Sequence, residues 1–391
     1  TVVNSPVKFI PRDDRGRFTG GGAVRIDDPA PMPDFLTVEN ARAMIPEAVR
    51  GWLAKALAWD AEGADPAPVT TIAASPGAGK SVGTREVLAG LDLSTLAGDV
   101  VFYAPSLALA DEAAADAESL GAGWHVTRGR GAINPATATP MCDRAELAET
   151  VAKAGLSVGA TLCKRIEGGQ EFRCPFYESC AYRKQWEGLG SAPVLRFEAS
   201  QYLSLPGDGS DRPTALRVID ETIWRQFTGT ADLTFDRWTQ PRRARPWKTP
   251  AERDAAEGAA VDVTVAAGEV LAALQTGASP VLDRYTAEDF ERFAKAEGGA
   301  DVLQARPDAD DASLMFEAQA HAELNAGARK RAAVWRVLAD CRRRGLSVTD
   351  RLRIVRNQPT PGSGDKRDVL RVAWFTVPPR DVPALLLDAD M

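Results

Sequence analysis

The sequence has no apolar run long enough to cross a membrane, and its N-terminus lacks the core of a signal peptide. It has no internal repeat and no excess of basic residues, since 54 acidic residues outnumber 47 lysines and arginines. Five cysteines in 391 residues are too few for a secreted disulfide scaffold. These absences exclude a membrane-spanning or disulfide-framework protein, predict a cytoplasmic location, and restrict any nucleic-acid binding to local basic patches.

The composition that is present is that of a globular protein, with 45% hydrophobic and 26% charged residues. The chain starts at Thr1 and stops at Met391 directly after an apolar run, so we interpret it as a piece of a longer polypeptide. Four groups of basic side chains are candidate nucleic-acid contacts, and each is equally well explained as a solvated helix face or loop. These groups are Arg128 with Arg130, Arg242 with Arg243, Arg245 and Lys248, Arg329 with Lys330 and Arg331, and Arg342 with Arg343 and Arg344.

Short apolar runs alternate with helical periodicity, which predicts an α/β fold with a parallel sheet covered on both faces. The predicted strands are 69–72, 99–105, 123–127, 193–197 and 215–221, and the predicted helices are 35–59, 82–91, 107–120, 251–274, 287–296 and 312–344. Two late strands, 369–376 and 384–388, are expected to return to the same sheet. Pro46 is expected to break or restart the first helix.

The most specific motif is Ala73–Ser81 (AASPGAGKS), which follows a predicted strand and opens a predicted helix, the context of a Walker A phosphate loop. Gly77 and Gly79 lack Cβ atoms, so backbone N–H groups can curl round the β- and γ-phosphates of a nucleotide. Lys80 supplies a cation for the same oxygens, and the Ser81 hydroxyl is placed to ligate Mg²⁺. The predicted nucleotide-binding residues are Ser75, Pro76, Gly77, Ala78, Gly79, Lys80 and Ser81.

The run Val218–Glu221 (VIDE) predicts the second half of an ATP site, a Walker B strand with carboxylates at its carboxyl end. Asp220 is expected to hold Mg²⁺, directly or through water, and Glu221 to orient and deprotonate the attacking water. Together with Lys80, these two carboxylates are the predicted catalytic residues.

Four of the five cysteines, Cys142, Cys163, Cys174 and Cys180, lie within 39 residues. Four thiolates form a complete ligand set for one metal centre, either tetrahedral Zn²⁺ or a [4Fe–4S] cluster. Their separations of twenty, ten and five residues lack the close knuckles of structural zinc sites, which favours the cluster. The alternative is that they are unligated buried cysteines, as is expected for the distant Cys341.

The order of these parts is a Walker A loop, VFYAPSLALADE, a four-cysteine insertion ending CPFYESCAY, VLRFEASQYL and VIDE. This order resembles the iron–sulfur superfamily 2 DNA helicases of the XPD/DinG kind. The resemblance implies that 74–81 is motif I, that 104–106 is motif Ia, and that the four cysteines hold a [4Fe–4S] cluster inserted in a RecA-like P-loop NTPase domain.

The resemblance extends to two further motifs. Asp220 and Glu221 match the start of the DEAH box, although 222–223 is Thr-Ile in place of Ala-His and lacks the histidine that links ATP to motif III. Residues 385–390 (LLLDAD) resemble motif III. The implied domains are a linker or extended arm at 1–33, RecA-like parts at 34–130 and 191–229, the four-cysteine insertion at 131–190, a mainly helical arch-like insertion at 230–368, and a return to the RecA-like sheet at 369–391.

The resemblance implies an ATP-dependent helicase that translocates on single-stranded or forked DNA, with the cluster domain at the point of strand separation. A second RecA-like domain would supply the arginine fingers from a further part of a longer replication or repair protein, so this chain is expected to bind nucleotide weakly and hydrolyse it slowly. Tyr177, Tyr182 and Trp186 are candidates for base stacking, although local packing explains them more readily. The alternatives are a P-loop ATPase of another kind with structural zinc, and a non-catalytic nucleic-acid-binding module with a decayed ATP site.

Overall fold

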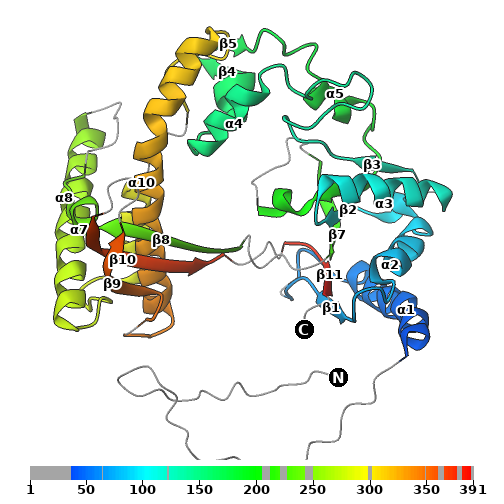
Figure 1. Ribbon diagram of the computed structural model, residues 1–391, viewed down its shortest axis with the longest axis horizontal. Coiled ribbons are helices and arrows are strands. Elements are labelled where there is room, and N and C mark those ends of the chain that lie inside the picture. The colour runs from blue at the N-terminus through cyan, green and yellow to red at the C-terminus, as the bar shows by residue number, and fades with distance from the viewer. Residues whose placement is uncertain are drawn as a thin grey trace, which may run out of the picture.

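The computed structural model describes residues 37–63, 65–120, 123–204, 212–220, 227–242, 250–297, 302–347, 349–359, 365–376 and 381–388. In Figure 1 the main sheet and its helices lie on one side of the molecule, and a body built around long helices lies on the other. The segment 131–190, which contains the four clustered cysteines and is called the cysteine-rich segment below, lies above and between them.

The main sheet is parallel, and its strands follow the order β1-β11-β7-β2-β6-β3. These strands are β1 (Val69–Ala73), β2 (Asp99–Ala104), β3 (Trp124–Val126), β6 (Leu195–Ala199), β7 (Thr214–Asp220) and β11 (Ala384–Asp388). The predicted α/β fold with a parallel sheet is therefore confirmed. The late strand β11 lies between β1 and β7, so the expected return of 384–388 to this sheet is also confirmed.

Three helices pack against one face of the main sheet, namely α1 (Val38–Leu57), α2 (Lys80–Ala89) and α3 (Leu107–Ser119). Trp52 of α1 and Leu88 of α2 share a buried cluster with Phe102 of β2. On the opposite face Val101 and Tyr103 of β2 pack with residues near 203 and 227. Every residue of β2 is buried, as expected for a central parallel strand covered on both faces.

The prediction that Pro46 breaks the first helix is wrong, because α1 runs unbroken from Val38 to Leu57. An internal proline costs a helix about 3 kcal/mol, since it removes one hydrogen bond and crowds the preceding turn. The buried face of α1 continues through this position with Ile45, Val49 and Trp52. Gly83 of α2 faces Ile45 and Pro46 closely enough that a Cβ there would lie 3.2 Å from Ile45, so close packing offsets the local cost.

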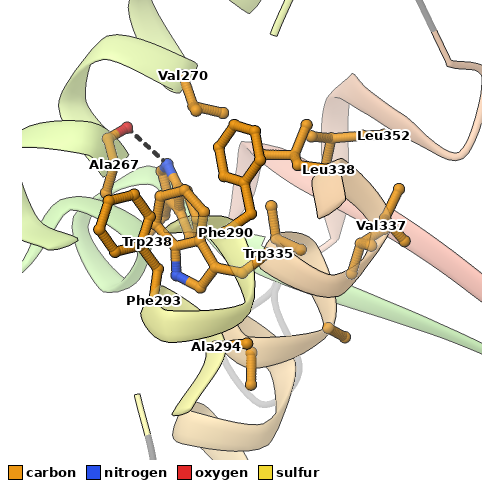
Figure 2. Packing of buried hydrophobic residues seen from close by; sticks show 14 of the residues in the cluster. Trp238, Ala267, Val270, Phe290, Phe293, Ala294, Trp335, Val337, Leu338 and Leu352 are labelled. Atoms are coloured by element: carbon orange, nitrogen blue, oxygen red, sulfur yellow. Dashed lines mark hydrogen bonds between the residues drawn. The ribbon is translucent and has the colours of Figure 1, made fainter. Parts of the chain in front are cut away.

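The second body combines four helices with a three-stranded antiparallel sheet of order β8-β10-β9. Its elements are β8 (Thr228–Thr234), α7 (Phe235–Thr239), α8 (Pro250–Thr276), α9 (Ala287–Ala296), α10 (Asp311–Arg343), β9 (Leu352–Pro359) and β10 (Lys366–Phe375). Its core is aromatic, and the Trp335 ring contacts those of Trp238, Phe290 and Phe293 (Figure 2). The Trp238 indole N–H donates to the carbonyl oxygen of Ala267 at 2.8 Å, which satisfies the polar edge of a buried ring.

The expectation that the strand at 369–376 returns to the main sheet is wrong. This segment forms β10, which pairs with β8 and β9 in the second body. Its inward residues Leu370 and Val372 belong to the same buried cluster as Trp335. The predicted strand itself is confirmed, but the apolar pattern of a strand does not indicate which of two sheets it joins.

The cysteine-rich segment forms α4 (Ala145–Lys153), the hairpin of β4 (Lys164–Glu167) and β5 (Gln170–Arg173), and α5 (Ala181–Glu187). It docks on the N-terminal half of α10, where Leu147 and Val151 of α4 share a buried cluster with Leu314 and Ala318. Arg165 adds hydrogen bonds to the carbonyl oxygens at 303, 304 and 305. Among the described helices, none combines the length and apolar character needed to cross a membrane.

Candidate functional site

The predicted phosphate loop connects the carboxyl end of β1 to the first turn of α2. Gly77 and Gly79 have φ values of 79° and 83°, in the left-handed region that strains a residue carrying a Cβ. Lys80 is buried, and its ammonium donates to the carbonyl oxygens of Ala74 at 2.5 Å and Ser75 at 3.4 Å. The loop therefore curves round the side chain of its own lysine.

The two predicted magnesium ligands meet. The Ser81 hydroxyl donates to a carboxylate oxygen of Asp220 at 2.6 Å, although the two residues are 139 positions apart. The reason is topological: β1 and β7 flank β11 in a parallel sheet, so their carboxyl ends reach the same edge. A hydroxyl and a carboxylate held together are oxygen ligands of the kind that Mg²⁺ prefers.

Several predicted residues lie outside the part of the chain that the structure describes. Glu221, the expected water-positioning carboxylate, is one of them, as are 222–223 and the last two residues of the motif III-like stretch, 389–390. Their roles stay predictions.

A cavity of about 200 Å³ adjoins the Ser81–Asp220 pair, between α2 and α3. Besides that pair it is lined by Arg85 of α2, and by Glu112 and Asp116 of α3. Arg85 is almost fully buried and donates to Asp116 at 3.2 Å. No sequence signal marked Arg85, because its importance depends on how the two helices pack.

A second cation lies on the rim of the loop. Arg42 of α1 donates to the carbonyl oxygen of Gly77 at 3.1 Å. Its side chain passes Gly79 at van der Waals distance from the position of a Cβ. No sequence signal marked Arg42 either, since it lies about thirty residues before the motif, on a different helix.

The four clustered cysteines are brought to one cavity of about 20 Å³. Cys163 and Cys174 flank the β4–β5 hairpin, where the Cys174 N–H donates to the Cys163 carbonyl oxygen at 2.9 Å. Cys142 and Cys180 are brought together because the N–H of Tyr182 donates to the carbonyl oxygen of Met141 at 2.8 Å. The cavity has room for about one water molecule, so little free space separates the side chains.

The protonation of these thiols is uneven. A hydrogen bond between Cys142 and Cys180 raises the pKa of the Cys142 thiol and lowers that of Cys180 to about 6. Burial raises the pKa of Cys174. Among the described residues, no three His, Cys, Asp or Glu side chains are arranged to hold a single metal ion. The four cysteines thus line one cavity, but their side chains are not arranged as a tetrahedral metal site.

Three arginines also line the cysteine cavity, but they differ in their contacts. Arg130 donates to the Cys163 sulfur at 3.8 Å and lies over the Tyr182 ring. Arg144 donates to the carbonyl oxygens of Pro307 and Ala309. Arg183 lies over the ring of Tyr177 at 3.7 Å. Positive charge of this kind offsets the negative charge of thiolate ligands.

The aromatic candidates for base stacking are engaged within the segment. The rings of Tyr177 and Tyr182 are covered by arginines, and the Trp186 ring contacts His125 and Arg196. Local packing, the simpler of the two sequence interpretations, accounts for all three.

Most of the described basic side chains from the four predicted patches have acidic or carbonyl partners. Arg128 binds Asp111, Arg242 and Arg331 bind Glu297, and Arg329 donates to the main chain at 153–154. Arg342, Arg343 and Arg344 pair with Asp283, Glu291 and Asp340 in turn. Arg243, Arg245 and Lys248 lie outside the described residues. Arg242 and Arg331 share the single charge of Glu297, and Arg329 donates to uncharged carbonyl oxygens, so the described patches keep part of their positive charge.

Comparison with protein-family models and with curated proteins finds no match for this chain.

Proposed function

We propose that this chain is the nucleotide-binding motor part of an ATP-dependent DNA helicase, with a RecA-like sheet and a four-cysteine metal centre. The observation that carries the nucleotide part is the 2.6 Å hydrogen bond between Ser81 and Asp220, two residues that only the fold brings together. A phosphate loop opposite a carboxylate at the edge of a parallel sheet is the arrangement that P-loop NTPases use.

Each residue of the site has a chemical role in this proposal. Ser81 and Asp220 hold Mg²⁺, and the glycine-rich loop binds the phosphates through its N–H groups. Lys80 exchanges its present carbonyl partners for phosphate oxygens, which attract an ammonium more strongly. Glu221 orients and deprotonates the attacking water.

The helicase part of the proposal is supported by the order of the motifs and by the position of β11. The motif III-like strand lies between the strand of the phosphate loop and the strand that ends in Asp220. This strand pairs with both strands that lead into the proposed nucleotide site, a position that suits a coupling element between ATP and single-stranded DNA. The six-stranded parallel sheet is compatible with a RecA-like domain.

The nucleotide proposal is tested by equilibrium titration with a fluorescent ATP analogue, with and without Mg²⁺. Lys80→Ala is expected to weaken binding about tenfold or more, since hydrogen bonds to charged groups contribute about 1.5–3 kcal/mol. Asp220→Asn is expected to remove the dependence on Mg²⁺. Lys55→Ala and Asp262→Asn, on exposed helix positions, are the matched controls. Equal binding by Lys80→Ala and the wild type contradicts the proposal.

The helicase part needs a separate measurement, the effect of single-stranded DNA on ATP hydrolysis. The rate of this chain is expected to be slow, because the arginine fingers of such motors come from a second RecA-like domain. A brisk rate that single-stranded DNA leaves unchanged favours a P-loop ATPase of another kind.

We further propose that Cys142, Cys163, Cys174 and Cys180 hold a [4Fe–4S] cluster. Four cysteines on one cavity supply the donor set that such a cluster needs, and neighbouring arginines balance its charge. Because the cavity is small, binding is expected to move the β4–β5 hairpin away from 142 and 180. When bound, the cluster supplies a rigid crosslink and one-electron redox chemistry to this segment.

The cluster proposal is tested by anaerobic purification followed by iron, sulfide and zinc analysis. About four irons per chain are expected in the wild type, with loss in Cys174→Ser. Cys341→Ser is the matched control, because Cys341 is buried in α10, in the core of the second body. One zinc per chain supports the alternative of a P-loop ATPase with structural zinc.

A further inference from the structure

Arg85 stands out in the cavity beside the Ser81–Asp220 pair. It belongs to α2, one turn after Ser81, and its side chain is 8% exposed. Helical side chains tilt toward the N-terminus of their helix, which brings the guanidinium back toward Ser81. It therefore places a fixed positive charge in the cavity that the magnesium pair adjoins.

The hydrogen bonding of Arg85 is incomplete. A guanidinium has five N–H donors. Among the described residues Arg85 makes one hydrogen bond, from Nη2 to Asp116 at 3.2 Å, and its Nε–H is buried without an acceptor. Asp116 is a weak anchor, because its side chain is 60% exposed to solvent.

Other buried arginines of the molecule differ from Arg85 in this respect. Arg144 and Arg217 also have an unpaired Nε, but each places its remaining donors on two or more acceptors. A buried charged donor without an acceptor is destabilising, so a protein retains one where a ligand or water completes it. The position of Arg85 beside Ser81 points to a ligand that also uses Mg²⁺.

We propose that Arg85 makes this site prefer a nucleoside triphosphate to a diphosphate, by donating to the third phosphate from within the same chain. This inference rests on the proposed nucleotide site. Lys80 and Ser81 belong to the part of a phosphate loop that reaches the β- and γ-phosphates and Mg²⁺. A guanidinium one turn further along α2 addresses the terminal phosphate, and planar N–H pairs match phosphate oxygens. Asp116 holds Arg85 in place while the phosphate is absent.

The proposal is tested by isothermal titration calorimetry with Mg·AMP-PNP and Mg·ADP. Arg85→Gln is expected to weaken AMP-PNP binding about tenfold or more, because a charge-assisted hydrogen bond is lost, and to change ADP binding less than about twofold. Arg85→Lys keeps the charge but not the planar fork, so an intermediate loss is expected. Arg50→Gln, on an exposed position of α1, is the matched control.

Asp116→Asn separates recognition from structure. If Arg85 serves only to tie α2 to α3, Asp116→Asn and Arg85→Gln weaken both nucleotides alike, and the proposal is overturned. If Arg85 contacts the third phosphate, Asp116→Asn leaves AMP-PNP binding unchanged or tighter, because it releases the guanidinium. A wild-type chain that binds neither nucleotide overturns the proposed function itself. A wild type that binds both, with an unchanged AMP-PNP to ADP ratio in Arg85→Gln and Arg85→Lys, overturns this inference alone.

Discussion

Glu297, at the end of α9, provides a quantitative test of how the second body is held together. Its side chain is fully buried, and each of its two carboxylate oxygens accepts from charged donors. One oxygen accepts from Arg242 at 2.6 Å and from the Trp335 indole at 2.9 Å, and the other accepts from Arg331 at 2.5 Å. One carboxylate thus satisfies two arginines and the ring at the centre of the aromatic core.

Glu297→Ala leaves two buried or nearly buried guanidinium groups without their counter-charge, since Arg242 is 3% and Arg331 12% exposed. Breaking a buried pair from one side costs about 3–5 kcal/mol, which is a large part of the total stability of a domain, about 5–15 kcal/mol. Glu297→Gln keeps an acceptor for Trp335 but loses the charge, so a smaller loss of about 2 kcal/mol is expected.

The assay is urea unfolding followed by tryptophan fluorescence, because Trp238 and Trp335 lie in ring contact within this core. Urea is uncharged and leaves ion pairs unscreened. A chain with two bodies need not unfold in one step, so hydrogen exchange of α9 and α10 assigns the transition. Glu323→Ala, at an exposed position of α10, is the control. A loss below about 1 kcal/mol in Glu297→Ala, equal to that of the control, refutes the reasoning.

Two further variants test other parts of the structure. Burial, followed by the charge of nearby arginines, lowers the pKa of His125 from its usual 6.5 to about 4, so the unfolded chain binds more protons between these values. The free energy of unfolding of the wild type is therefore expected to fall as the pH drops from about 6.5 to about 4. The His125→Gln variant is expected to lose less stability over the same pH range. Equal losses in the two proteins would argue against a buried neutral imidazole. Arg165→Ala removes three hydrogen bonds to the carbonyl oxygens at 303–305, so about 2 kcal/mol or more of protection against hydrogen exchange is expected to disappear from the β4–β5 hairpin. Arg173→Ala, at an exposed position on the same hairpin, is its control, and similar exchange in both variants would contradict the docking role.

The sharp turn at 77–79 was predictable from local chemistry, because glycine adopts the left-handed φ values found at Gly77 and Gly79. The phosphate-binding roles of Lys80 and Ser81 follow from residue type and order, and they stay a prediction. The meeting of Ser81 with Asp220 followed from one further rule, that parallel strands end at a common edge. The four cysteines were likewise predictable as a group, because crowding in the sequence restricts how far apart they can lie.

Features that depend on packing between distant elements were not predictable. Pro46 lies inside α1 although proline normally ends a helix. Burial of one face of α1 and its close packing against Gly83 stabilise the helix by more than the lost hydrogen bond destabilises it. The strand at 366–375 has the same alternation whichever sheet it joins. Nothing in the sequence distinguishes Arg85 from the other arginines. Its position beside Asp116 and the cavity depends on how α3 packs against α2.

The ion pairs formed by the clustered basic residues affect where nucleic acid can bind. The sequence shows four clusters of positive charge, but it does not show their partners. In the described part of the chain, Arg128, Arg242 and Arg342 to Arg344 form ion pairs with aspartates or glutamates. The nearby carboxylates repel phosphate and partly cancel the charge of these arginines, which weakens the salt-dependent attraction that drives such binding. If the chain binds DNA as proposed, we therefore expect the contacts to come from main-chain N–H groups, from basic side chains outside these ion pairs such as Arg329, or from residues outside the described ranges.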